Sequence, residues 1–176
     1  MDVLGIVALA VIGVIAALLI AASSRPDQFR TARSLKIAAP PDRIFPLIND
    51  LLRMNTWNPF ALRETTGTSS YSGPAAGKGQ AHQFAGSKFG AGSIEIVEST
   101  PPSNVTLRLQ MTKPLKCDNK VEFTLVPEGN ATIVTWAMSG KQPLLAKAMM
   151  LFVDCDKMVG REFETGLANL KSKAEA

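Results

Sequence analysis

The chain has few of the residues from which metal and thiol sites are built: its 176 residues include one histidine and two cysteines. Because His82 is the single histidine of this sequence, a metal site with several histidine ligands is excluded. Cys117 and Cys155 lie far apart, without the short spacing of a metal-binding pair, and a reducing cytoplasm would keep both as free thiols. We therefore expect no metal site and no cofactor.

The sequence also lacks clusters of charge of one sign. Nineteen lysines and arginines against fifteen acidic residues give a formal charge of +4, and these residues are scattered along the chain. A nucleic-acid-binding surface typically appears as a basic stripe with interleaved aromatic residues, which is missing here. We therefore expect no nucleic-acid partner, and the composition leaves the oligomeric state open.

Residues 3–22 form an uninterrupted apolar run. As a helix, such a run spans the hydrocarbon core of about 30 Å. A cleaved secretory signal is the alternative, but it needs a basic start and an apolar core of about 7 to 15 residues, whereas only Asp2 is charged here and the run is longer. The sequence therefore predicts a transmembrane anchor at residues 1–24 and a single domain at residues 25–176.

Basic residues follow the run and are absent before it: Arg25, Arg30, Arg33 and Lys36. The positive-inside rule then predicts a single-pass inner-membrane protein whose C-terminal domain faces the cytoplasm. Export after signal cleavage is the alternative.

The remaining sequence alternates between strand and helix patterns. Alternation predicts a strand at Phe29–Ile37, and Pro40 and Pro41 start two short helices that reach about Met54 with a break near Asn49–Asp50. Short hairpin strands fit the glycine-rich residues 65–92. Stronger strand patterns lie at Ser93–Glu98, Val105–Met111, Lys120–Val126 and Ala131–Ser139.

One long helix is predicted from Pro143 to about Lys171, a stretch without internal proline. Its apolar residues fall on one broad face when they are placed at helical intervals, which predicts that the helix covers the apolar side of the antiparallel sheet. This order of elements predicts an α+β fold, in which a strongly curved sheet holds the C-terminal helix.

Short motifs along the chain carry a family resemblance. They are Arg33-Ser34 with Ile37–Pro41 and Ile44-Phe45, Trp57-Asn58-Pro59, Thr135–Met138, and Asp156–Gly160 with Phe163-Glu164. In order and spacing the chain resembles the SRPBCC or START-like superfamily, specifically its polyketide cyclase/dehydrase-like members. The resemblance implies a helix-grip fold of about seven strands around the C-terminal helix, with an elongated cavity for an apolar ligand.

Asp156 is a candidate site residue because its position falls within the apolar face of the predicted long helix, beside Phe152 and Phe163. A buried carboxylate is costly unless it is paired. In a structural interpretation it hydrogen-bonds the Trp57 indole, a backbone amide or Arg53. In a functional interpretation it is a polar group inside the cavity, with a raised pKa, that orients a ligand or transfers a proton.

His82, in a strand beside Phe84, is the second weak catalytic candidate. In the simpler interpretation it is a partly buried, hydrogen-bonded side chain. The predicted cavity lining comprises Trp57, His82, Phe84, Leu109, Met111, Phe123, Trp136, Met138, Met149, Phe152 and Asp156. Aromatic residues and methionines at such spacings usually belong to a packed core, so each also has that simpler interpretation.

Three functions fit these patterns. The first is a membrane-anchored binding module for a hydrophobic or amphipathic small molecule: a lipid, a quinone or a polyketide-like compound. The second is a cyclase- or dehydrase-type enzyme that uses the same cavity, although few polar residues are present to supply acid and base. The third is a non-catalytic interaction or regulatory module. Fold alone does not decide between them.

Overall fold

The computed structural model describes the chain from Val3 to Ala176, except for Met150, Phe152 and Val153. Within this range it describes only the backbone of six further residues: Leu4, Ile6, Ala8, Leu145, Met149 and Cys155.

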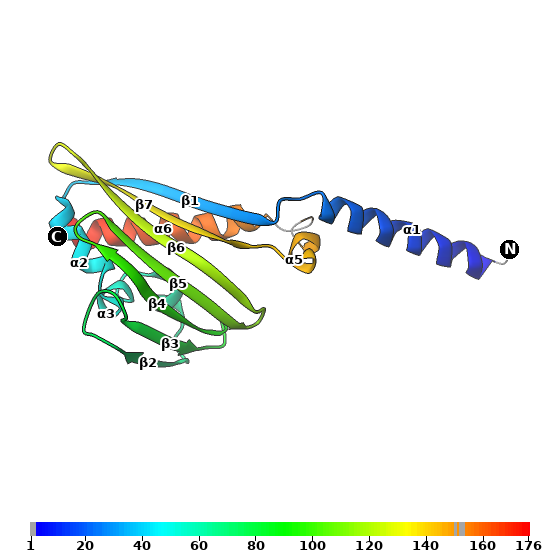
Figure 1. Ribbon diagram of the computed structural model, residues 1–176, viewed down its shortest axis with the longest axis horizontal. Coiled ribbons are helices and arrows are strands. Elements are labelled where there is room, and N and C mark those ends of the chain that lie inside the picture. Colours follow the sequence, from blue (N-terminus) through cyan, green and yellow to red (C-terminus); the bar gives the residue numbers. More distant parts are fainter. Residues whose placement is uncertain (1–2, 150, 152–153) are drawn as a thin grey trace.

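Helix α1 (Val3–Ser23) extends away from the rest of the molecule (Figure 1). Several of its large apolar side chains are exposed, from Val7 to Ile20. Within the part of the chain that the structure describes, no helix has the length and apolarity that a membrane crossing requires. The transmembrane helix predicted for residues 3–22 is therefore not supported.

Seven antiparallel strands form one sheet in the order β1-β7-β6-β5-β4-β3-β2. Every strand pairs with its neighbour in sequence except β1, which lies beside β7 and so brings the first strand next to the last. This confirms the predicted antiparallel sheet. The strands are β1 (Gln28–Ile37), β2 (Thr68–Ser72), β3 (Ala81–Ala85), β4 (Ala91–Thr100), β5 (Asn104–Lys113), β6 (Cys117–Glu128) and β7 (Ala131–Lys141).

Three short helices connect β1 to β2: α2 (Pro41–Ile48), α3 (Leu51–Met54) and α4 (Pro59–Arg63). The predicted break lies where Asp50 caps α3, since its carboxylate accepts the backbone N–H of Leu52 at 2.9 Å. Helix α4 was not expected. Its N-cap is Asn58, whose side-chain oxygen accepts the backbone N–H of Phe60 at 3.1 Å.

The prediction of one long C-terminal helix is wrong, because the chain forms α5 (Leu144–Met149) and α6 (Cys155–Glu175) instead. Asp154 has non-helical backbone angles and accepts the backbone N–H of Lys157 at 2.9 Å, so it is an N-cap at which α6 begins anew. Lys147 of α5 contacts the segment before β1, where its ammonium group donates to Asp27 at 2.6 Å.

The core lies between the inner face of the sheet and the helices α2, α3 and α6 (Figure 1). From α6, Phe163, Leu167 and Leu170 are almost completely buried, and they belong to the same core cluster as Val105 and Leu107 of the sheet. The molecule therefore has the predicted α+β, helix-grip architecture. The C-terminal part of α6, with Leu167 and Leu170, packs in the core, whereas its N-terminal part, with Val159 and Phe163, borders a cavity.

Candidate functional site

A cavity of about 510 Å³ lies on the inner face of the sheet, between β2 to β7, the α3–α4 region and the start of α6. Most of its wall is apolar, with Ile94, Val121 and Val159 among the lining side chains. Seven of the residues predicted for a ligand cavity line it: His82, Phe84, Leu109, Met111, Phe123, Trp136 and Met138.

Trp57 belongs to the core and is not among the residues that line the cavity. Its side chain is 0% exposed, and its indole N–H donates to the carbonyl of Leu47 at 2.8 Å. Edge-to-face contacts join its ring to Phe123 and Trp136. Of the other three predicted lining residues, Phe152 and the Met149 side chain lie outside the described residues, and Asp156 does not line the cavity.

Asp156 is not buried, so the prediction of a carboxylate within the cavity wall is wrong. Its side chain is 58% exposed, and its Oδ2 lies 3.1 Å from the guanidinium Nη2 of Arg33, which also binds Glu164. The hydrogen bond from Arg33 lowers the pKa of Asp156 below its usual range, opposite to the expected shift. Asp156 does share a helix face with Phe163, seven residues further along α6, but it lies in the first turn of the helix, where its carboxylate meets Arg33 of β1 at the protein surface.

Gly160 explains how Arg33 reaches across α6. A Cβ atom at position 160 would collide with the Arg33 guanidinium, so the absence of a side chain gives the arginine its place beside the helix.

Neither the Trp57 indole nor Arg53 is the partner of Asp156. Arg53 instead forms an ion pair with Asp50 at 3.4 Å.

A hydrogen-bonded polar cluster lies at the β2 side of the cavity and consists of Asn55, Ser69, Tyr71 and His82. The Asn55 side-chain nitrogen Nδ2 lies 2.8 Å from the Tyr71 hydroxyl and 3.2 Å from His82 Nδ1. On the other side of the imidazole, His82 Nε2 lies 2.5 Å from the Ser69 hydroxyl. Tyr71 and His82 are register partners on β2 and β3, and their rings stack with centroids 4.5 Å apart.

The placement of the Asn55 amide assigns one tautomer to His82. Nδ2 of an asparagine only donates hydrogen bonds, so His82 Nδ1 accepts and the ring proton resides on Nε2. That Nε2–H group then donates to the Ser69 oxygen. The His82 side chain is only 7% exposed, and its burial lowers the pKa of the imidazole below the usual 6.5, so the ring is neutral at pH 7.

Titration of His82 provides a direct test, because it is the single histidine of the chain. Imidazole ¹H–¹⁵N spectra of the full chain are expected to show the Nε2–H tautomer and a pKa below that of the urea-unfolded chain. The unfolded state then binds more protons below about pH 6.5, so the free energy of unfolding falls as the pH decreases from 6.5 towards the folded pKa. An imidazole that is already charged at pH 7 would contradict this arrangement.

Three further residues that line the cavity carry polar groups of note: Glu64, which is hydrogen-bonded within the protein, and Asn119 and Trp136, which each have a buried polar atom without a partner among the described residues. Glu64 accepts the backbone N–H of Lys88 at 2.9 Å, which lowers the pKa of the Glu64 carboxyl and keeps it ionised. Two buried atoms, Asn119 Oδ1 and Trp136 Nε1, have no hydrogen-bond partner among the described residues. Among those same residues, no cluster of three potential metal ligands occurs.

Sequence reasoning identified His82 but missed Asn55, Ser69 and Glu64. Ser69 belongs to the glycine-rich stretch, where the strand pattern is weakest, and Asn55 follows a four-residue helix. The pairing of β2 with β3 brings Ser69 and His82 together. The alternation of Ser69 and Tyr71 on one face of a strand was the one signal present in the sequence.

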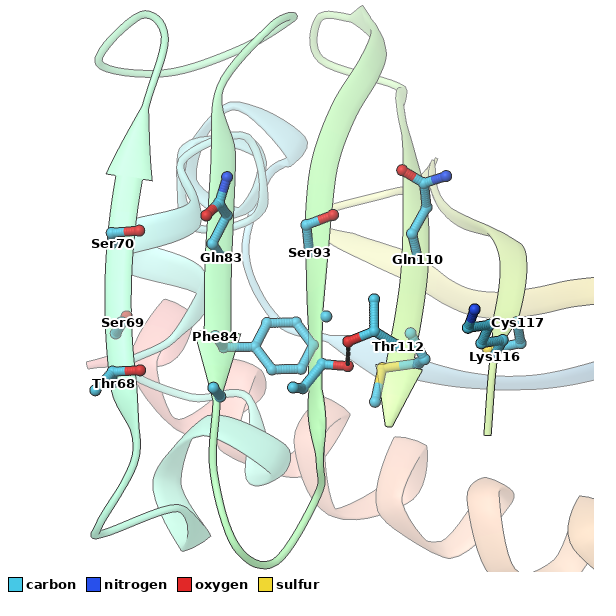
Figure 2. A pocket seen from close by; sticks show the side chains of 14 residues that line it. Thr68, Ser69, Ser70, Gln83, Phe84, Ser93, Gln110, Thr112, Lys116 and Cys117 are labelled. Carbon is cyan, nitrogen blue, oxygen red and sulfur yellow. Dashed lines mark hydrogen bonds between the residues drawn. The ribbon is translucent and has the colours of Figure 1, made fainter. Parts of the chain in front are cut away.

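A second hollow, an open groove of about 660 Å³, lies across strands β2 to β5. Figure 2 shows a polar row formed by Ser70, Gln83, Ser93 and Gln110, one residue from each strand. These residues are register partners across the sheet. Polar residues are usual on the solvent face of an antiparallel sheet, so the apolar cavity is the better candidate for a ligand site.

Comparisons with known proteins agree with this architecture. The family model described as "Polyketide cyclase / dehydrase and lipid transport" matches residues 28–175. A search of curated proteins finds no match. Among solved structures, the chain is similar to protein CV1439 from Chromobacterium violaceum, with a TM-score of 0.60, 18% identity, and coverage of 86% of this chain and 99% of that one.

Two further structures show the same fold at low identity. The di-domain ARO/CYC protein BexL of the BE-7585A biosynthetic pathway has a TM-score of 0.64 at 10% identity, over 90% of this chain and 53% of BexL. The major latex-like protein 151 from Panax ginseng has a TM-score of 0.59 at 12% identity, over 84% of this chain and 97% of the ginseng protein.

Proposed function

Because the chain belongs to the polyketide cyclase/dehydrase and lipid transport family, we propose that it binds a hydrophobic or amphipathic small molecule between the sheet and α6. The ligand is a lipid, a quinone or a polyketide-like compound. The observation that carries the proposal is the cavity of about 510 Å³ with its largely apolar wall. Its volume falls in the usual range for small-molecule sites.

The chemistry of the wall supports an apolar ligand of irregular shape. Met111 and Met138 contribute flexible, polarisable thioethers, and Phe84, Phe123 and Trp136 contribute flat apolar surface. The few polar side chains lie mainly at the β2 side. Such a distribution suits a molecule whose body is apolar and whose polar groups are few.

A cyclase- or dehydrase-type enzyme is the second candidate, favoured by the contact of His82 with Tyr71 at the cavity wall. General acid–base catalysis requires a group that is free to accept or donate a proton to the substrate. Both ring nitrogens of His82 are already engaged, with Asn55 and Ser69. This occupancy favours binding over proton transfer by the imidazole.

Binding is tested with N-phenyl-1-naphthylamine, an apolar probe whose fluorescence rises in an apolar environment. Titration of the full chain is expected to be saturable with about one probe per chain. Mass spectrometry after gentle purification is expected to find a co-purified apolar molecule that competes with the probe. If there is neither saturable binding nor a retained molecule, the proposal is wrong.

The cellular location is a further proposal, based on the sequence alone. If residues 3–22 cross a membrane, the basic residues that follow them, among them Arg25 and Arg30, would hold residues 25–176 in the cytoplasm. Cell fractionation with N-terminal sequencing of the mature protein distinguishes this from export after cleavage.

A further inference from the structure

In the polar cluster at the β2 side of the cavity, two hydroxyl protons have no partner among the residues that the structure describes. The Ser69 oxygen accepts the Nε2–H group of His82, and the Tyr71 oxygen accepts from Asn55. Among the described residues, neither hydroxyl takes part in any other side-chain hydrogen bond. Each hydroxyl has therefore used its acceptor side within the protein, and its own O–H is free to donate.

Both hydroxyls are presented to the cavity. Ser69 and Tyr71 are two residues apart on β2, so their side chains lie on the same face with Cα atoms about 7 Å apart, and both line the cavity. Tyr71 is 38% exposed, so this edge is reachable from outside. Stacking on His82 and the hydrogen bond with Asn55 hold the Tyr71 ring in place.

The charges around the cavity favour ligands with neutral acceptor oxygens over ligands with carboxylate or phosphate groups. The described lining residues include Glu64, which is ionised, and neither lysine nor arginine. A carboxylate or phosphate would lose its hydration there without gaining a cationic partner and would meet the Glu64 charge. A neutral carbonyl oxygen accepts hydrogen bonds without this cost.

We infer that Ser69 and Tyr71 form a donor subsite for the neutral carbonyl oxygens of the bound molecule, with His82 and Asn55 directing the two hydroxyl protons towards the ligand. This inference rests on the proposed function and narrows the ligand to an apolar ketone, ester or quinone. The carbonyl end lies at the β2 side of the cavity, and the apolar body lies along β5 to β7.

The test compares three fluorescent probes on the full chain. 6-Propionyl-2-dimethylaminonaphthalene (Prodan) has one ketone, and its emission shifts to the red when the ketone accepts a hydrogen bond. N-Phenyl-1-naphthylamine has no oxygen, and cis-parinaric acid has a carboxylate. In the double variant Ser69→Ala/Tyr71→Phe, the affinity for Prodan is expected to fall about fivefold or more, with a blue shift of the bound emission. The affinity for N-phenyl-1-naphthylamine should change less than about twofold.

Ser70→Ala is the matched control, because Ser70 lies on the same strand but points to the outer groove (Figure 2). It should leave the binding of all three probes unchanged. Unchanged Prodan affinity and emission in the double variant would overturn the inference, as would an equal loss for both neutral probes. Tighter binding of cis-parinaric acid than of Prodan would also overturn it. Absence of N-phenyl-1-naphthylamine binding to the unmodified chain would instead refute the proposed function.

Discussion

Replacement of Leu109 and Met138 by tryptophan is expected to weaken the binding of N-phenyl-1-naphthylamine by at least about tenfold, the equivalent of ~1.4 kcal/mol. Leu109 pairs with Asn119 on β6, and the Asn119 amide lies 3.8 Å from the Met138 sulfur, so both substitutions fill the same section of the cavity. Two indole rings placed there occupy the space that the probe needs. Fluorescence titration of the full-length double variant measures the loss.

Overpacking also costs stability, about 1 to 3 kcal/mol for each insertion, so circular dichroism and urea denaturation must show that the variant remains folded. Leu115→Trp is the control, because it adds the same ring to a side chain that is half exposed. It should leave probe binding intact. A folded double variant that binds the probe as tightly as the unmodified chain would place the binding site elsewhere, α1 included.

Trp57→Ala is expected to lower the free energy of unfolding by about 3 to 5 kcal/mol. The side chain is fully buried and packs against Phe123 and Trp136, and its removal also leaves the carbonyl of Leu47 without its donor. A total stability of about 5 to 15 kcal/mol is usual for a domain, so this is a large fraction of it. Urea denaturation measures the change.

Phe84→Ala is the comparison for this variant. Phe84 is half-buried and lines the cavity, so its loss enlarges an existing hollow and should cost clearly less stability than the loss of Trp57. A cost below about 1 kcal/mol for Trp57→Ala would show that the indole is not a core element, since a buried tryptophan typically contributes more.

Much of the fold follows from local patterns. The alternation from Val105 to Met111 and from Ala131 to Ser139 predicted strands that the structure confirms as β5 and β7. The two prolines at 40 and 41 marked the start of α2 correctly. Strand alternation and helix starts depend on neighbouring residues, so a single sequence contains the information that they need.

The C-terminal helix shows where this reasoning fails. The apolar periodicity continues from residue 144 to residue 170, but Asp154 acts as a cap and divides the stretch into α5 and α6. A short polar side chain inside a helical pattern is compatible with either outcome. Which one occurs depends on tertiary contacts, such as that of Lys147 with Asp27, which hold α5 beside the start of β1.

The sequence by itself predicted the antiparallel strands, the start of α2, the apolar inner face of the sheet and seven of the side chains that line the cavity, because these depend on periodicity and on motifs along the chain. The tertiary structure alone decided that Asp156 pairs with Arg33 at the surface, that Trp57 is core, and that Asn55, Ser69 and His82 meet at one edge of the cavity. These contacts join residues from separate elements. Their geometry arises only when the curved sheet closes over α6.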